Sequence, residues 1–331
     1  MVAEPRHEKR TWLLTGTTGF VGAAVLQALA GSGSFSPTIF CLGRKRPASC
    51  PVDRFLEFDL SFHSAKTLSD VLAPLGPLAV IHAAGRTPPA DAPAMFSTNT
   101  RGTACLLEAI QLLQTSARMV LVGSAAELGP VPVDQLPAHE LTPCRPVDSY
   151  GLSKWSSTRL GLSASNPGRL EVMVGRLFNP IGPAVPTSQV FGRLARELSM
   201  PRMGVAEMVL GNLGASRDFF DVRDAASALI TLIHEGKHGQ LYHIGSGTPH
   251  TVAEGLGHLI RLSGRSVSIR GAGDPPRQGP SSSWASISRV LNETSWRPRI
   301  SFEQSLKDLW DDVSLRQALR DSPQAEPRQV A

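Results

Sequence analysis

The stretch Thr11-Trp12-Leu13-Leu14-Thr15-Gly16-Thr17-Thr18-Gly19-Phe20-Val21-Gly22 decides the fold of this chain. It opens with a short apolar run typical of a buried strand, and glycines follow at 16, 19 and 22. An apolar helical pattern continues to Ala30, where 31–33 (Gly-Ser-Gly) is expected to end the helix. An ordinary tight turn is the simpler interpretation. The position of the turn between strand and helix favours dinucleotide binding, in which backbone and helix N-terminus meet a pyrophosphate.

Strand-like and helix-like runs alternate beyond this stretch. Strands are expected at 38–42, 55–60, 78–82, 118–123, 170–177 and 240–244, and helices at 99–112, 150–163 and 225–234. The alternation predicts an α/β fold, a Rossmann-type doubly wound parallel sheet with ligands at the carboxyl ends of its strands. Residues 178–183 are expected to be irregular because of their prolines and glycine, and 186–216 to lie outside the main sheet.

The composition indicates the cellular compartment and excludes some classes of binding partner. The 331 residues carry a formal charge of +5 with a pI of about 9.3, but no stretch interleaves basic and aromatic residues, so nucleic acid is not the expected partner. The four cysteines lack metal or redox spacing, which predicts no metal site and a reducing compartment. No apolar run reaches the length of about 20 residues that spans a bilayer. We expect a cytoplasmic protein with no membrane partner and with mobile tails at 1–10 and 320–331.

The residues after the second expected strand point to the type of cofactor. A carboxylate about 20 residues beyond the glycines commonly binds a free ribose 2′-hydroxyl. Here the corresponding run is Gly43-Arg44-Lys45-Arg46, with three cations and no acid. We therefore expect NADP(H) to be preferred, with NAD(H) possible. The alternative is a solvated loop with incidental charge.

Three other expected strands deliver polar or small residues to the same edge. Asp59 is placed to accept a hydrogen bond from an adenine amino group, and Ala83-Ala84 leaves room for a cofactor. Ser124 follows the strand at 118–123 and is placed to donate to a substrate carbonyl oxygen, although such a serine also commonly caps a helix. His82 is interpreted as a satisfied core residue.

Tyr150 and Lys154 are four residues apart in an expected helix and so share one face. A tyrosine hydroxyl has a pKa of about 10, and a neighbouring ammonium group makes proton transfer from it easier. The pair is therefore suited to acid–base chemistry at a carbonyl or an alcohol. Because this spacing is common in helices, an exposed helical face is the alternative for the motif taken alone.

The ordered set of motifs resembles the extended short-chain dehydrogenase/reductases, the NAD-dependent epimerase/dehydratase family, in its nucleotide-sugar branch. The matching elements run from residue 11 to about 312 and include 15–22, Asp59-Leu60, 82–84, Asn99, Ser124, Tyr150/Lys154, 176–183, 217–219, 242–247 and 296–298. The resemblance implies a cofactor domain at 11–175, to which 218–246 returns. It also implies a smaller C-terminal α/β substrate-binding domain at 176–217 and 247–319.

The resemblance also implies roles for individual residues. Tyr150 is the expected proton donor, Lys154 tunes it and holds the nicotinamide ribose, and Ser124 binds the substrate oxygen. Asn179 and Arg217 match family residues that contact the sugar-nucleotide diphosphate, and Glu127 is a further expected substrate contact. The expected cofactor contacts are Gly16, Thr18, Gly19, Phe20, Val21, Gly22, Arg44, Asp59, Leu60, Ala83, Ala84, Asn99 and Lys154.

The residues after Ser124 limit the type of reaction that is expected. Dehydratases of this family carry an acid/base pair directly after the equivalent residue, whereas this chain has Ala125 and Ala126. The run 122–129 resembles that of GDP-4-dehydro-6-deoxy-D-mannose reductases, as do 211–213 and 305–309. Ala125 and Leu128 depart from that pattern, in which many relatives have a serine and a tyrosine.

We therefore expect NADPH-dependent reduction of the 4-keto group of a nucleotide-linked 4-keto-6-deoxysugar. The alternatives are a nucleotide-sugar 4-epimerase, a ketoreductase for a non-sugar metabolite and, least favoured, a non-catalytic cofactor-sensing protein. A homodimer is expected through the helices at about 100–114 and 150–163. Leu106, Leu107, Ile110 and Leu113 are candidates for that interface or for the core.

Overall fold

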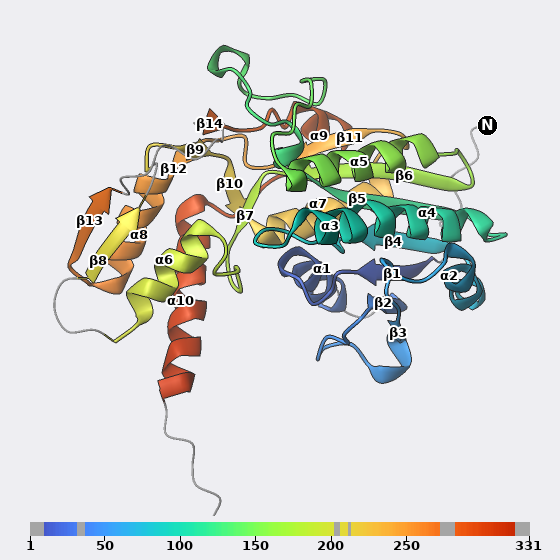
Figure 1. The fold of residues 1–331 in the computed structure, drawn as a ribbon, viewed down its shortest axis with the longest axis horizontal. Helices are drawn as coiled ribbons and strands as arrows, with labels where there is room; N and C mark the ends of the chain where they lie inside the picture. The colour runs from blue at the N-terminus through green and yellow to red at the C-terminus, as the bar shows by residue number, and fades with distance from the viewer. Residues whose placement is uncertain (1–9, 32–36, 202–205, 211–212, 272–281, 322–331) are drawn as a thin grey trace, which may run out of the picture.

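A seven-stranded parallel sheet forms the centre of the molecule, as the alternating pattern predicts. The computed structural model describes residues 10–31, 37–201, 206–210, 213–271 and 282–321 (Figure 1). The strands are β1 (Thr11–Thr15), β2 (Ile39–Gly43), β3 (Phe55–Glu57), β4 (Leu78–His82), β5 (Ala117–Ser124), β6 (Leu170–Leu177) and β11 (Leu241–Ile244). Their order is β11-β6-β5-β4-β1-β2-β3, and every neighbouring pair is parallel. The chain runs outward from β1 and returns at β4, so a ligand crevice is expected between the ends of these strands.

Helices cover both faces of the sheet (Figure 1). On one face, α1 (Phe20–Ala30), α7 (Val222–Glu235) and α9 (Ser288–Glu293) contribute to one apolar cluster. On the other face, α2 (Ala65–Leu72), α4 (Gly102–Leu112) and α5 (Ser149–Ala164) pack on a second cluster. The shorter helical turns are η1 (Val52–Arg54), η2 (Ala73–Leu75), α3 (Ala92–Met95), the π-helical η3 (Phe96–Arg101), η4 (Ala125–Glu127) and η5 (Val133–Gln135).

A smaller part lies beside the carboxyl end of the sheet (Figure 1). Its helices α6 (Val190–Ser199), α8 (Val252–Ser263) and α10 (Phe302–Asp321) enclose a third apolar cluster. Three small sheets complete it: β7 (Asn179–Ile181) with β10 (Phe219–Asp221), β8 (Ala206–Leu210) with β13 (Val267–Gly271), and β9 (Ser216–Arg217) between β12 (His250–Thr251) and β14 (Ser282–Ser283). The domain boundaries expected from the sequence stay a prediction.

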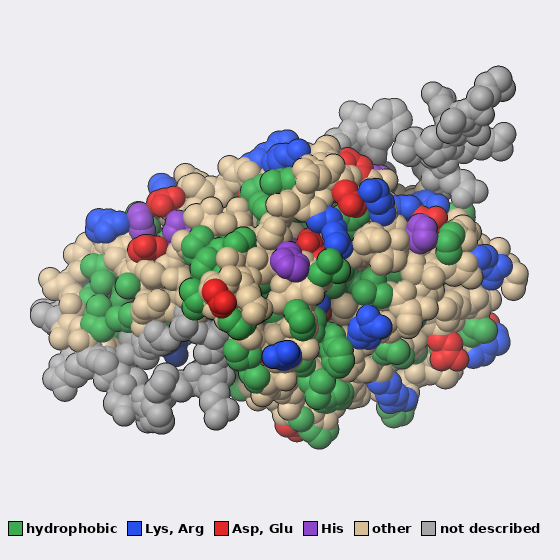
Figure 2. Space-filling model, turned by 90° about the horizontal axis from the view of Figure 1, so that it is seen from above, with side chains coloured by type: hydrophobic (Ala, Val, Ile, Leu, Met, Phe, Trp, Pro, Cys, Tyr) green, Lys and Arg blue, Asp and Glu red, His purple; other side chains and the backbone are tan. Residues whose placement is uncertain are grey.

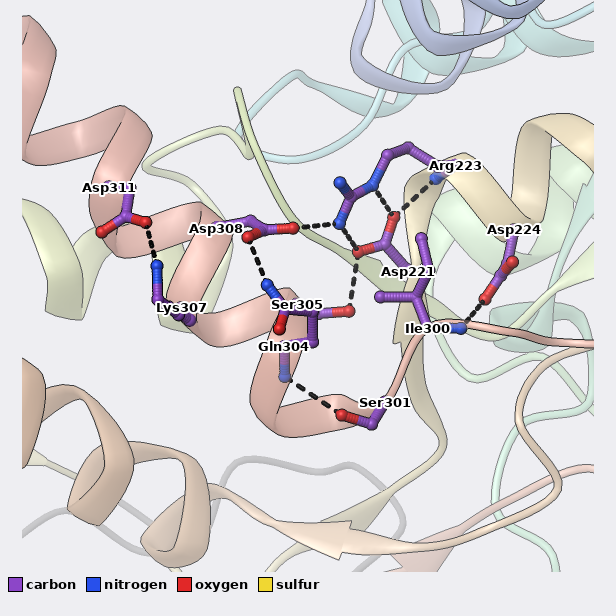
Figure 3. Close-up of polar contacts among 10 residues, drawn as sticks. All are labelled: Asp221, Arg223, Asp224, Ile300, Ser301, Gln304, Ser305, Lys307, Asp308 and Asp311. Carbon is purple, nitrogen blue, oxygen red and sulfur yellow. Dashed lines mark hydrogen bonds and ion pairs between the residues drawn. The ribbon is translucent and has the colours of Figure 1, made fainter.

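Two acidic side chains at the start of α7, Asp221 at the N-cap and Asp224 in the first turn, connect the two parts. Asp221 caps α7 through the backbone N–H of Arg223 at 2.8 Å, and its Oδ2 accepts a 2.7 Å bond from Ser305 of α10. Asp224 Oδ2 accepts the backbone N–H groups of Arg299 and Ile300 at 3.0 and 2.9 Å. Figure 3 shows most of these contacts converging on the start of α10.

Three local predictions are wrong. Residues 178–183 were expected to be irregular, but β7 pairs with β10 in parallel, with Pro180 opposite Phe220. A proline is tolerated there because each strand of a two-stranded sheet has an open edge. The strand expected at 55–60 ends at Glu57, and the helix expected at 225–234 begins at Val222, after its Asp221 cap.

The four leucine and isoleucine residues considered for a dimer face belong to the core. Leu106, Leu107, Ile110 and Leu113 are all buried within the chain. The tails at 1–9 and 322–331, and residues 211–212, lie outside the described residues. None of the described helices combines the length and apolar character needed to cross a membrane. On the face shown in Figure 2, described Lys and Arg side chains lie among Asp and Glu side chains.

Candidate functional site

A cavity of about 590 Å³ lies at the carboxyl ends of the central strands. The glycine turn, the ends of β4 and β5 and the first turns of α5 and α6 contribute to its wall. Residues from 11–22, 83–88, 122–124 and 150–154 therefore meet there although they are far apart in the sequence. Six of the residues lining it are Gly19, Ala83, Ser124, Tyr150, Lys154 and Asn179.

The glycine turn has the geometry that a dinucleotide pyrophosphate requires. Gly16 has φ +72°, and a Cβ there would lie 2.5 Å from the carbonyl carbon of Ala83. A Cβ on Gly22 would lie 2.2 Å from the Gly16 carbonyl oxygen, so only glycine allows this turn. Gly19 caps α1 without a side-chain hydrogen bond, and the first turn holds no acidic residue. The backbone N–H groups of a first helical turn, at the positive end of the helix, suit an anionic ligand.

The individual residues of the turn lie where such a ligand is expected. Thr18 and Gly19 are exposed, and Gly16 is half-buried behind them. Phe20 and Val21 are half-buried and, with Gly19 and Gly22, line the cavity. Their assignment as cofactor contacts stays a prediction that this geometry supports.

The end of β4 is fixed by a buried polar chain. His82 lies between Thr15 and Thr103, with its Nδ1 2.7 Å from Thr15 Oγ1 and its Nε2 3.1 Å from Thr103 Oγ1. Thr15 Oγ1 in turn accepts the N–H of Ala84 at 3.1 Å. Burial, with a smaller contribution from the Lys154 charge, lowers the pKa of His82 to about 3. His82 is thus a satisfied core residue, as expected, and holds Ala84 in place beside Ala83, which lines the cavity.

Two of the expected cofactor contacts, Asn99 and Leu60, have buried side chains and are not among the described residues that line the cavity. Asn99 is fully buried, and its amide group accepts the N–H of Arg86 at 2.7 Å and donates to the Arg86 carbonyl at 3.0 Å. Its Nδ2 also donates to Ser153 Oγ at 2.9 Å. Asn99 therefore lies behind the cavity wall and fixes the backbone of Arg86. Leu60 packs in the core cluster with residues of α4, and its assignment as a cofactor contact stays a prediction.

Arg44 and Asp59 form an ion pair beside the outer strands β2 and β3. Arg44, exposed after β2, lies 4.0 Å from the Asp59 carboxylate. Burial opposes ionisation of Asp59, but hydrogen bonds from Ser61 and the Arg44 charge outweigh it, so the pKa of Asp59 is below its usual value. Lys45 and Arg46 are also exposed in this loop. The cations are accessible to an anionic group at the edge of the sheet.

Ser124, Tyr150 and Lys154 meet at the centre of the cavity. Asp148 caps α5 by accepting the Gly151 N–H at 2.7 Å, which places Tyr150 in the first turn. Burial raises the pKa of Tyr150, as do the charges of Glu127 and Asp148, while a hydrogen bond with Ser124 opposes the shift. Tyr150 is therefore protonated at neutral pH. Lys154, one turn later, donates to the Val122 carbonyl at 2.6 Å.

Glu127 does not line the cavity. Its side chain is fully buried, and its carboxylate accepts the Ser124 N–H at 2.7 Å and pairs with the Arg176 guanidinium at 2.8 Å. The expected substrate contact is therefore corrected. Glu127 supports Ser124 from behind, because the η4 turn directs its side chain back toward the strand end.

The two expected diphosphate contacts lie in different surroundings. Asn179 lines the cavity, and its Nδ2 donates to the Asp218 carbonyl at 3.3 Å. Arg217 lies on β9 and donates to the Ser216 carbonyl at 2.9 Å. It is not among the described residues that line the cavity, and burial lowers its pKa. Its phosphate contact stays a prediction.

Sequence reasoning missed Arg86 and Thr87, which line the cavity. Neither follows a strand directly, and neither belongs to a motif that the chain order singles out. The one available signal was position, since Arg86 comes two residues after Ala84. Gln189 and Phe191, from the start of α6, also line the cavity, and the only prediction for their segment, 186–216, was that it lies outside the main sheet.

Comparison with known proteins agrees with this architecture. Residues 12–245 match the NAD dependent epimerase/dehydratase family. The chain is 31% identical to GDP-6-deoxy-D-mannose reductase of Pseudomonas aeruginosa, over 72% of this chain and 81% of that protein. It is 29% identical to dTDP-6-deoxy-L-talose 4-dehydrogenase (NAD(P)(+)) of Kitasatospora kifunensis, over 89% and 93% of the two chains. The structure of RMD from Pseudomonas aeruginosa complexed with NADPH superposes with a TM-score of 0.79 and 29% identity, covering 93% and 99% of the two chains.

Proposed function

The chain belongs to the NAD dependent epimerase/dehydratase family of extended short-chain dehydrogenase/reductases, and from that premise we propose that it reduces the 4-keto group of a nucleotide-linked 4-keto-6-deoxysugar with NADPH. The observation that carries this proposal is the meeting of Ser124, Tyr150 and Lys154 in one cavity with the glycine turn. Ala125 and Ala126 supply no acid for dehydration. The two similar enzymes named above, a reductase and a 4-dehydrogenase, support redox chemistry at a deoxysugar.

Each residue of the centre has a role that its surroundings support. When bound, NADPH supplies a hydride to the carbonyl carbon. The Tyr150 hydroxyl gives its proton to the carbonyl oxygen, and its raised pKa keeps that proton available at neutral pH. Ser124 donates a hydrogen bond to the same oxygen and stabilises the charge that develops there. Lys154 holds the nicotinamide ribose and favours reprotonation of Tyr150.

Preference for NADPH over NADH follows in this proposal from Arg44, Lys45 and Arg46. All are exposed beside the sheet edge, and the loop offers no carboxylate to a ribose 2′-hydroxyl. A guanidinium group matches a phosphate with two parallel hydrogen bonds. Arg44 is placed to take the 2′-phosphate while Asp59, 4.0 Å away, is placed to face the adenine.

The substrate extends in this proposal from Tyr150 toward Asn179 and the first turn of α6. Arg86 is a candidate to bind an anionic or oxygen-rich part of the nucleotide sugar, since its backbone is fixed by Asn99 and the residue lines the cavity. The enzyme is further proposed to be a cytoplasmic homodimer. Leu112 of α4 and Leu152 of α5, 47% and 41% exposed, are candidates for that interface.

A 4-epimerase is the second candidate, because the matched family includes epimerases and the Tyr150/Lys154 pair is suited to acid–base chemistry at an alcohol as well as at a carbonyl. Such an enzyme oxidises and reduces the sugar in place and keeps its nicotinamide tightly bound. A ketoreductase for a non-sugar metabolite is also compatible with Ser124, Tyr150 and Lys154. A cofactor-sensing protein has no need of that complete set.

The test is a panel of GDP-, UDP-, dTDP- and CDP-linked 4-keto-6-deoxysugars with NADPH, measured by loss of nicotinamide absorbance. The proposal expects stoichiometric NADPH oxidation with one nucleotide series and a raised melting temperature with the same series. Purified protein that retains nicotinamide and interconverts 4-epimers without net NADPH oxidation would establish the epimerase instead. NADPH oxidation with only non-sugar ketones would establish the third candidate.

A further inference from the structure

Glu127 joins three elements of the site through a carboxylate that solvent does not reach. Its Oε1 accepts the backbone N–H of Ser124 at 2.7 Å and the Thr158 hydroxyl at 3.1 Å. Its Oε2 accepts two guanidinium nitrogens of Arg176 at 2.8 and 3.1 Å. The end of β5, the middle of α5 and the end of β6 are therefore connected at one buried group.

The turn that carries Glu127 also orients Ser124. Ser124 is the N-cap of η4, and its Oγ accepts the Ala126 N–H at 3.3 Å. The Glu127 carboxylate completes the capping box by accepting the Ser124 N–H. The position of the Ser124 hydroxyl, which shares the cavity with Tyr150, depends on this turn.

The carboxylate lies against Gly123 at the end of β5. A Cβ on Gly123 would lie 2.8 Å from Glu127 Oε1, so the strand end is shaped around the acid. Arg176 is held from the far side by His243 Nε2 at 3.2 Å and Cys144 Sγ at 3.2 Å. His243 Nδ1 lies 3.1 Å from the Ala138 carbonyl oxygen.

A buried ion pair of this kind needs an explanation beyond stability. Both side chains are almost completely buried, at 0% and 2% exposure. The desolvation cost of two buried charges commonly equals or exceeds their attraction. Apolar residues of similar volume at the two positions would therefore give a protein that is at least as stable. An ion pair that fixes the geometry of a reacting group contributes to function, even where it contributes nothing to stability.

We propose that Glu127, held by Arg176, is a positioning residue that sets Ser124 against Tyr150 for proton donation to the substrate carbonyl. The inference rests on the proposed reduction and extends it to the support of the reacting groups. Glu127 touches neither cavity nor substrate and acts through Ser124 and through its charge. Asp148, at the start of α5, is the second acid near Tyr150, and Lys154 is the neighbouring cation.

The charge of Glu127 agrees with this role. It raises the pKa of Tyr150, in the same direction as burial, and so favours the protonated donor form. It also opposes the lowering of the Lys154 pKa that burial causes. Removing the charge is therefore expected to lower the pKa of Tyr150 and to move the alkaline limb of the reduction rate to lower pH.

The experiment uses tyrosine ring carbon NMR, because the chain has only two tyrosines, Tyr150 and Tyr242. Tyr150→Phe assigns the signals, and the pH titration of Tyr150 is followed in wild type and in Glu127→Gln. The matched control is Glu171→Gln, which removes the acid that pairs with Arg118 at the opposite end of the same two strands. No substrate is needed, so this measurement stands even where the proposed reduction fails.

The expected result is a Tyr150 titration about half a pH unit lower in Glu127→Gln and unchanged in Glu171→Gln. Turnover with the substrate that the panel identifies should fall about tenfold in Glu127→Gln, with the NADPH dissociation constant within about twofold of wild type. If Glu127→Gln does not fold because Arg176 is left unpaired, the same titration and turnover are measured in the double variant Glu127→Gln/Arg176→Met, which removes both charges. A folded variant with wild-type Tyr150 titration and turnover would overturn the proposal.

Discussion

Lys154 donates a 2.6 Å hydrogen bond from its Nζ to the carbonyl oxygen of Val122, so the ammonium group lies at the end of β5 beside Ser124. Burial lowers the pKa of Lys154, and the Glu127 charge opposes that change. The lysine is thus fixed by the main chain at the floor of the cavity. Tyr150, one turn earlier in α5, also lines the cavity and is the proposed proton donor.

This arrangement predicts different losses for the two residues. Tyr150→Phe should lower the turnover number by at least about a hundredfold while the NADPH dissociation constant stays near that of wild type, because only the donor hydroxyl is removed. Lys154→Met should lower turnover and weaken NADPH binding as well. Stopped-flow turnover and fluorescence titration of NADPH check both. Near-normal turnover in Tyr150→Phe would refute the assigned proton donor.

The cofactor preference is tested at the loop after β2. Arg44→Ala should raise the KM for NADPH about tenfold and leave the KM for NADH unchanged, since only NADPH carries the 2′-phosphate. Lys66→Ala, in an exposed ion pair with Asp70 on α2, is the control for loss of one surface cation. Equal effects of Arg44→Ala on both cofactors, or a wild type that prefers NADH, would contradict the prediction.

Much of the sheet and the centre of the site were predictable because they depend on local patterns. Strand runs, the glycine turn and the Tyr150/Lys154 spacing are each encoded within a few residues, and parallel topology brings strand ends to one edge. Whether a given polar side chain faces the cavity or lies buried behind it was not predictable from the sequence. Asn99 and Glu127 are polar and follow family motifs, yet both are buried by residues far along the chain.

The other differences between the expected and the observed structure also arise from contacts between residues that are far apart in the sequence. Pro180 lies in a strand because residues 219–221, some forty positions later, provide a partner on the edge that proline tolerates. Arg86 reaches the cavity because the Asn99 amide holds its backbone from another element. Leu106 and Ile110 fit either a core or an interface by periodicity, and only the packing of α4 on α2 and the sheet decides for the core.

The pH dependence of stability should reflect buried neutral histidines. His82 has a pKa of about 3 when folded and 6.5 ordinarily, so the unfolded chain binds more protons between these values. The free energy of unfolding should therefore fall as pH drops from 6.5 toward 3. His82→Gln should be less stable at pH 7.5 but lose up to about 2 kcal/mol less than wild type between pH 7.5 and 5. Urea unfolding at the two pH values measures this, and equal losses would contradict it.

The contact between α7 and α10 should contribute to stability through one hydroxyl. Ser305→Ala removes a buried donor from Asp221 Oδ2 and should lower the free energy of unfolding by about 1–2 kcal/mol. Gln304→Ala, which removes an exposed bond to Asp308 in the same network (Figure 3), should change it by less than about 0.5 kcal/mol. Urea unfolding of both variants checks the difference. Equal effects would mean that the buried bond contributes no more than the exposed one.

Arg86 provides the sharpest test of the substrate end of the cavity. Its backbone N–H and carbonyl are both bound by Asn99, so replacing the side chain should leave the loop in place. Arg86→Ala should raise the KM for the nucleotide sugar about tenfold with a smaller change in turnover, because the role proposed for this side chain is substrate binding and not proton transfer. Arg86→Lys should recover only part of this, since an ammonium group lacks the guanidinium fork. Unchanged NADPH affinity would assign the side chain to the substrate, whereas a tenfold loss of NADPH affinity with an unchanged sugar KM would assign it to the cofactor.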